Sequence, residues 1–123
     1  MQAGGPRTDL DRMGSLEIVR LINAEDAGVA GAVARVADDI AAAIRPATRL
    51  VIINHGSNVL GTIQDAAAIG RICREKGVLF AMDTAQTAGI VPIDMAAWNV
   101  DLVAFTGHKS LMGPTGTGGM IVG

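Results

Sequence analysis

Three reactive side chains follow one short apolar segment near the carboxyl-terminal end of the chain. Thr106, His108 and Lys109 come directly after Leu102-Val103-Ala104-Phe105, a run of strand length that polar and glycine residues bound. A hydroxyl, an imidazole and an amine therefore reach the carboxyl end of one predicted strand, which is where open α/β sheets place their ligand sites. Five glycines and one proline between Gly107 and Gly119 let the backbone turn tightly and approach a ligand closely.

Two earlier apolar runs end in the same way. Asn58 follows the run at 50–53, and Asp83 and Gln86 follow the run at 78–82. Right-handed crossovers bring the carboxyl ends of parallel strands to one edge of a sheet. The sequence therefore predicts that a carboxylate and two amides converge with the hydroxyl, imidazole and amine of the last strand.

Several chemistries fit this set poorly. His55 and His108 lie on separate loops with only Asp83 as a third ligand, which is a weak metal pattern. Ser57 lacks the G-x-S-x-G context of a hydrolase nucleophile. The glycines at 113–119 lack the Lys-Ser or Lys-Thr ending of a phosphate-binding loop. Pyridoxal 5'-phosphate uses every part: an amine for its aldehyde, an acid for its pyridinium nitrogen, and hydroxyl or imidazole donors for its phosphate.

The same segments resemble the class V aminotransferase superfamily of fold type I, and most closely its cysteine desulfurase and selenocysteine lyase branch. The motifs that carry the resemblance are, in chain order, Ser57-Asn58-Val59-Leu60-Gly61-Thr62, Asp83-Thr84-Ala85-Gln86-Thr87-Ala88-Gly89, Pro92-Ile93-Asp94, Asp101, Phe105-Thr106-Gly107-His108-Lys109 and Gly113-Pro114-Thr115-Gly116-Thr117-Gly118. Their order and gaps match the family from about Ser15 to Gly123.

The resemblance implies a role for each of six residues. Lys109 is the Schiff-base lysine, Asp83 pairs with the pyridinium nitrogen, Gln86 contacts the phenolate oxygen, Thr106 and His108 contact the phosphate, and Asn58 lies near the ring and the substrate. His55 also resembles family sequences, but a hydrogen-bonded structural histidine is the more common outcome for such a residue.

The resemblance also implies a reaction in which cysteine yields alanine and its sulfur passes to a cysteine thiolate of the enzyme. Intact relatives are homodimers that bind an amino-acid substrate and pass sulfur to an acceptor protein. Residues 15–123 match only part of the cofactor-binding large domain, without the family's upstream part, small domain and acceptor cysteine. We therefore expect this chain alone not to desulfurate cysteine. An aminotransferase of other substrate, and a non-catalytic α/β module that serves assembly, stay open as alternatives.

Helical patterns separate the predicted strands. Apolar residues at three- and four-residue spacings predict a helix over 30–44, which Pro46 ends. Asp65 is a suitable N-cap for a helix that runs to about Lys76, and Gly77 suits its left-handed end. The aliphatic run at 50–53 is typical of a parallel strand covered on both faces.

The remaining segments complete an α/β fold. Residues 1–14 are expected to be a loose lead-in, and Leu16, Ile18 and Leu21 predict a short strand that ends near Ile22. The segment 119–122 follows too closely for a helical crossover and should return antiparallel. The expected architecture is a mainly parallel sheet with flanking helices and a final antiparallel strand, as part of a fold type I large domain.

Composition narrows the functional classes. The 123 residues carry a formal net charge of −2 and only 2% aromatic residues, which gives no case for nucleic-acid binding. No apolar run approaches the roughly 20 residues that span a bilayer. The single cysteine, Cys73, lies on the apolar face of a predicted helix and is expected to be an inert buried thiol. A soluble, cytoplasmic protein is the expectation.

Overall fold

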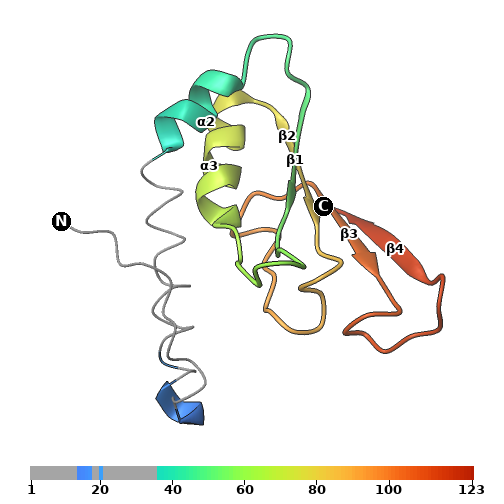
Figure 1. Ribbon diagram of the computed structural model, residues 1–123. Coiled ribbons are helices and arrows are strands. Elements are labelled where there is room, and N and C mark those ends of the chain that lie inside the picture. Colours follow the sequence, from blue (N-terminus) through green and yellow to red (C-terminus); the bar gives the residue numbers. More distant parts are fainter. Residues whose placement is uncertain (1–13, 18–19, 21–35) are drawn as a thin grey trace.

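The computed structural model describes residues 14–17, 20 and 36–123 as a layer of helices beside a four-stranded sheet (Figure 1). The elements are α2 (Ala37–Ala43), β1 (Leu50–Asn54), α3 (Ala66–Lys76), β2 (Leu79–Asp83), β3 (Leu102–Thr106) and β4 (Gly118–Val122). The strands lie in the order β1-β2-β3-β4. The first three are parallel and β4 is antiparallel to β3, which confirms the predicted architecture.

The register of the sheet aligns the ends of the parallel strands. Asn54 of β1 pairs with Asp83 of β2, and Asp83 pairs with Ala104 of β3. Figure 1 shows the loops after β1, β2 and β3 on the same side of the sheet, below the strands in that view. Every residue that the sequence assigned to a site therefore lies on these loops or at the end of β2 or β3.

Helix α3 begins and ends as its sequence predicts. The side chain of Asp65 accepts a hydrogen bond from the Ala68 backbone N–H at 2.9 Å, and Gly77 ends the helix with a left-handed φ of 65°. One face of α3, which includes Ile69 and Cys73, is buried against the sheet. The core is centred on Phe80 of β2, whose side chain is fully buried.

The strand predicted near Leu16 is wrong, and the helix predicted over 30–44 lies only partly within the described residues. Ser15–Glu17 and Arg20 are helical where a strand was expected, while residues 18–19 and 21–35 lie outside the described part. The helix begins there because the Gly14 N–H donates to the Glu17 carboxylate at 2.8 Å, a local cap that favours a helical turn. The helix expected over 30–44 is seen as α2 from Ala37 to Ala43, and Ile44 is already extended two residues before Pro46.

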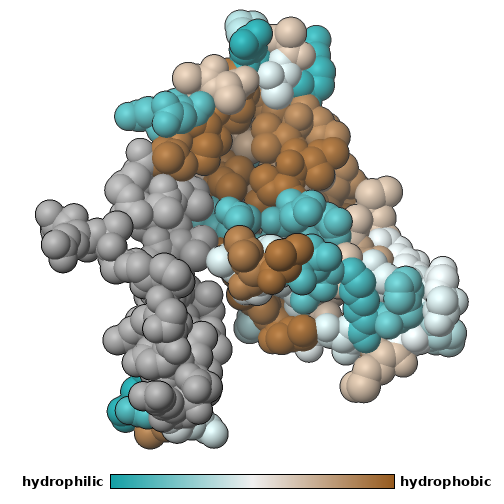
Figure 2. Space-filling view, in the orientation of Figure 1, coloured by the Kyte–Doolittle hydropathy of each residue, from teal (hydrophilic) through white to brown (hydrophobic). Residues whose placement is uncertain are grey.

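The strand β1 is not covered on both faces. Ile52 is 64% exposed, whereas Val51 and Ile53 face the helices and pack against the core. The face that carries Ile52 also carries Leu79 and Met120, both exposed, because no described element packs on that side. In Figure 2 apolar residues gather over the helices and the β1–β2 region, above a band of hydrophilic residues. Among the described residues, no helix has the length and apolar character needed to cross a membrane.

Gly70 controls how closely α3 can approach the segment before β3. A Cβ atom at this position would overlap the backbone carbonyl oxygen of Trp98. We predict that Gly70→Ala lowers the free energy of unfolding by about 1–3 kcal/mol, although alanine is the better helix former. Urea unfolding monitored by circular dichroism measures the change. The exposed neighbour Arg71 serves as the control, since Arg71→Ala should stay within about 0.5 kcal/mol of the parent chain. Equal stability of Gly70→Ala and the parent chain would show that the helix tolerates a side chain there.

Candidate functional site

A polar cavity lies at the carboxyl ends of the three parallel strands. Its volume is about 190 Å³, and its lining residues are Asn54, Gly56, Asn58, Asp83, Ala85, Gln86 and Lys109. The first three follow or end β1, the next three end or follow β2, and Lys109 follows β3. The cavity therefore depends on all three parallel strands ending together.

The turn after β1 is built around Ser57. Its hydroxyl oxygen accepts hydrogen bonds from the backbone N–H groups of Val59 and Leu60, at 3.2 and 3.1 Å. Its own backbone N–H donates to the Thr62 carbonyl at 2.9 Å. The Ser57 hydroxyl thus stabilises a tight turn, and the exposed Asn58 side chain is carried at the rim of the cavity.

The loop after β2 is held from both ends. One carboxylate oxygen of Asp83 accepts a hydrogen bond from the Ala85 N–H at 2.9 Å. The Thr84 hydroxyl, fully buried, donates to the Ala104 carbonyl of β3 at 2.8 Å. These two contacts turn the chain sharply after β2, so that the Asp83 carboxylate and the Gln86 amide line the same cavity.

The loop that carries Lys109 closes on itself. The Gly107 N–H donates to the Thr117 carbonyl at 2.8 Å, and the Gly113 N–H donates to the Gly107 carbonyl at 2.7 Å. A Cβ atom on Gly107 would overlap the Thr117 side chain, so only glycine fits between the two ends of the loop. The Met112 N–H donates to the Lys109 carbonyl at 2.8 Å, which places Lys109 in a closed turn.

Four of the six residues assigned by resemblance line this cavity: Asn58, Asp83, Gln86 and Lys109. The other two do not. Thr106 ends β3 and is half-buried, and His108 is exposed beside Lys109. Both flank the lysine along the chain, but neither lines the cavity.

The donor set suits pyridoxal phosphate. A primary amine, a carboxylate and three amides line one open cavity, and this set can serve the cofactor's aldehyde, pyridinium nitrogen and ring oxygen. The volume of 190 Å³ is below the roughly 300 Å³ at the small end for pockets that enclose a small molecule. The described residues therefore form one wall of a site, against which one side of a ring can rest.

His55 is buried beside the cavity and does not line it. Its Nδ1 atom lies 2.9 Å from the Thr87 hydroxyl oxygen, and its ring packs against Trp98 with centroids 5.6 Å apart. Burial lowers the pKa of His55 below its ordinary value of 6.5. The residue is a hydrogen-bonded structural histidine, as the sequence analysis expected for the commoner case.

Cys73 cannot serve as a nucleophile in this environment. Cys73 lies on the buried face of α3 and its side chain is fully buried. Burial raises the pKa of its thiol, and the Asp101 carboxylate raises it further. The expectation of an inert thiol is thereby confirmed. Within the described residues no three His, Cys, Asp or Glu side chains gather in a way that could hold a metal ion.

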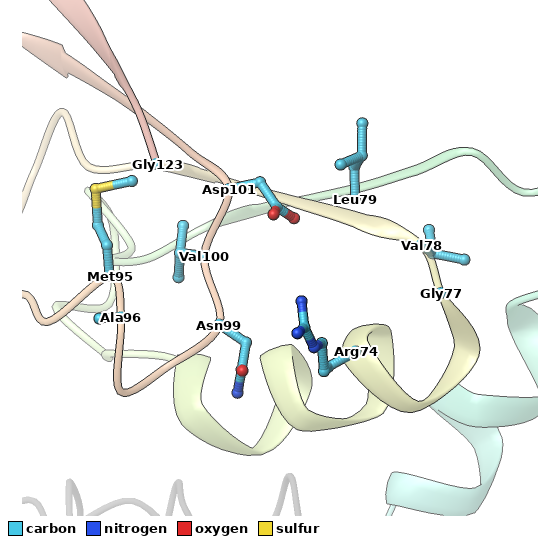
Figure 3. A pocket seen from close by; sticks show the side chains of 10 residues that line it. All are labelled: Arg74, Gly77, Val78, Leu79, Met95, Ala96, Asn99, Val100, Asp101 and Gly123. Carbon is cyan, nitrogen blue, oxygen red and sulfur yellow. The ribbon is translucent and has the colours of Figure 1, made fainter.

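A larger cavity lies at the opposite edge of the sheet. It has a volume of about 690 Å³ and is lined by residues at the amino ends of β2 and β3 and at the end of β4. Figure 3 shows Arg74 and Asp101 pointing toward one another across it, with Asn99 beside them. Asp101 already accepts a hydrogen bond from the Phe80 N–H at 2.7 Å. We assign no catalytic site to this cavity despite its size. Its charged lining residues, Arg74 and Asp101, have opposite signs, and its lining includes no nucleophile.

Two residues of the site escaped the sequence analysis. Asn54 lines the cavity as the last residue of β1, and its signal was a polar residue at the end of an aliphatic run. The Thr87 hydroxyl forms a hydrogen bond with His55. No local sequence pattern predicts this contact, because 32 positions separate the two residues.

Comparisons with known proteins show which family profile and which proteins this chain resembles. The profile of the aminotransferase class-V family matches residues 16–123. Cysteine desulfurase IscS of Shewanella baltica is 52% identical over 81 residues, which are 66% of this chain and 20% of that protein. A probable cysteine desulfurase of Methanothermobacter thermautotrophicus is 43% identical over 100 residues, or 81% of this chain and 24% of that one.

A solved structure gives the same result. The apo cysteine desulfurase of Thermococcus onnurineus NA1 superposes with a TM-score of 0.65 at 37% identity, over 70% of this chain and 21% of the other. The chain thus spans about a fifth to a quarter of the length of these relatives.

The neutral state of His55 predicts a pH dependence of stability. Since burial lowers its pKa in the folded chain, the unfolded chain binds more protons just below pH 6.5. The contribution of His55 to the free energy of unfolding should be fully present above pH 6.5 and should fall as the pH drops through the lower, folded pKa. Urea unfolding at about pH 7.5 and about pH 5.5 measures this difference.

Two variants isolate the cause. His55→Asn cannot titrate and should show a smaller loss between the two pH values than the parent chain. His108→Asn removes an exposed imidazole and should keep the parent dependence. The attribution to His55 fails if His55→Asn loses as much stability on acidification as the parent does.

Proposed function

The chain belongs to the aminotransferase class-V family, and from that premise we propose that it forms the lysine-bearing part of the cofactor domain of a pyridoxal-phosphate-dependent cysteine desulfurase. One observation carries the proposal: Lys109, which follows β3, lines the same cavity as Asp83 and Gln86, which end and follow β2. The relatives named above as cysteine desulfurases support the choice of reaction. In this proposal residues 15–123 are one portion of a larger cofactor domain.

Each residue of the cavity has a part in binding the cofactor. Lys109 supplies the amine that holds the aldehyde carbon. Asp83 would pair with the ring nitrogen, and its negative charge would keep that nitrogen protonated. The Ala85 N–H bound to one carboxylate oxygen fixes the orientation of the Asp83 side chain. When bound, the cofactor supplies an electron sink for the bond that breaks at the substrate α-carbon.

The neighbouring polar groups orient the ring. Gln86 would donate from its amide to the phenolate oxygen, and the Asn58 amide would contact the ring or the substrate. Thr106 and His108 lie outside the cavity and flank Lys109, so they are suited to the phosphate, which extends beyond the ring. The Lys109 amine would serve as the base for the proton at the substrate α-carbon.

The reaction proposed for the whole enzyme is removal of sulfur from L-cysteine, with alanine as the product and a persulfide on the enzyme. This chain contributes no acceptor thiol, because Cys73 is buried. We therefore expect it to bind the cofactor and not to turn over cysteine unaided. A homodimer, a protein sulfur acceptor and a cytoplasmic location complete the proposal. The reducing cytoplasm suits an enzyme whose sulfur chemistry needs free thiols.

The two lysines of the chain provide a matched test. Mixing the purified chain with pyridoxal phosphate should produce the visible absorption band of the cofactor joined to a lysine. Lys109→Ala should abolish the band, whereas Lys76→Ala should retain it, since Lys76 is exposed at the end of α3. Asp83→Asn should weaken binding about ten- to a hundredfold, as expected for loss of a charge-assisted hydrogen bond. A band that is absent from the parent chain, or that survives Lys109→Ala, contradicts the proposal and favours a non-catalytic module.

A further inference from the structure

His55 and Thr87 join two of the loops that form the cavity. His55 is 2% exposed and Thr87 is 3% exposed, so their 2.9 Å side-chain contact is shielded from water. His55 follows β1 and Thr87 follows β2, and they are 32 positions apart in the chain. A buried hydrogen bond between loops resists their separation, because breaking it leaves two polar groups without water.

Gly56 tightens the same junction. A Cβ atom on Gly56 would lie 2.7 Å from the Thr87 methyl carbon and 3.5 Å from the Gln86 Cβ atom. The turn after β1 therefore lies directly against the loop after β2, at the residue next to Gln86. Gly56 and Gln86 both line the cavity, so the junction forms part of its wall.

Backbone bonds set the remaining geometry. The His55 N–H donates to the Asp83 carbonyl at 2.9 Å, and the Gln64 N–H donates to the His55 carbonyl at 2.8 Å. These bonds fix the His55 backbone next to β2, but they do not hold the loop beyond Asp83. On the β3 side the Thr84 side chain fixes that loop through Ala104. On the β1 side the only recorded side-chain hydrogen bond to the loop, among the described residues, is the one from His55 to Thr87.

We propose that His55 is a positioning residue, which acts through Thr87 to hold Asn58 and Gln86 at the separation that a ring cofactor needs. The inference rests on the proposed cofactor site. His55 does not touch that site, because it is buried and does not line the cavity. Its effect reaches the ligand only through the two loops, so it alters affinity without supplying a contact of its own.

The test separates this contact from general stability with paired threonine variants. Thr87→Val removes the hydroxyl at nearly constant volume, and Thr87→Ser keeps the hydroxyl. Thr48→Val is the matched control, since the Thr48 hydroxyl oxygen accepts a hydrogen bond from the Arg45 N–H at 3.0 Å, ahead of β1 and away from the cavity. Amide hydrogen exchange of the cofactor-free chain then reports the order of each loop.

Thr87→Val should speed exchange at the Ser57 and Ala88 amides, which donate to the Thr62 and Thr84 carbonyls of the two loops, about two- to tenfold relative to the parent, as loss of one hydrogen bond implies. Thr87→Ser should return both amides to the parent rate, and Thr48→Val should leave their rates unchanged once global stability is matched. The affinity for pyridoxal phosphate should follow the same order, about two- to tenfold weaker in Thr87→Val.

The possible failures are distinguishable. Parent-like exchange at both amides in Thr87→Val overturns the positioning role, whatever the cofactor does. Faster exchange with unchanged cofactor affinity also overturns it, because the loops would then move without consequence for the ligand. If neither the parent nor any variant binds pyridoxal phosphate, the proposed function fails. The positioning role then fails with it, even if the exchange rates show that the two loops are joined.

Discussion

Parallel pairing of β1, β2 and β3 is the constraint on which the site depends. The register places Asn54, Asp83 and Ala104 in one row, so that three loops leave the sheet at the same edge. A slip of one residue in β2 would exchange the faces of Asp83 and Met82, which would bury the carboxylate and expose a core side chain. Burial of Phe80 and Met82 against α3 prevents that slip. The apolar core therefore sets the position of the acid.

The three loops are also stabilised in a similar way. Each is held by side-chain or backbone hydrogen bonds at its base, and each carries its polar groups toward solvent. Ser57 stabilises the first loop, Thr84 the second, and the Gly107–Thr117 pair the third. The loops are thus ordered before any ligand arrives, which reduces the entropy lost on binding. The cavity that these loops form is small, at about 190 Å³, and the chain spans about a fifth of the length of Shewanella baltica cysteine desulfurase IscS.

Features set by neighbouring residues were predictable from the sequence. Asp65 and Gly77 cap the two ends of α3 as expected, because helix caps depend on a few adjacent positions. Contacts between distant residues were not: nothing near His55 indicates that Thr87 is its partner. The expected strand at Leu16 failed because the Gly14–Glu17 cap outweighs a loose apolar pattern. The aliphatic character of β1 suggested two covered faces, yet Ile52 is exposed, since hydrophobicity does not show whether a covering element is present.

The central claim is that one particular amine faces the Asp83 carboxylate across a space that accepts pyridoxal phosphate. The most direct measurement treats the chain with the cofactor, reduces the adduct with borohydride and locates the modified residue by peptide mass spectrometry. The account predicts a single phosphopyridoxyl group on the peptide that contains Lys109, formed in the native chain and lost when the chain is unfolded in urea first. Modification spread over Lys76 and the amino terminus, or equal labelling of the unfolded chain, would contradict it.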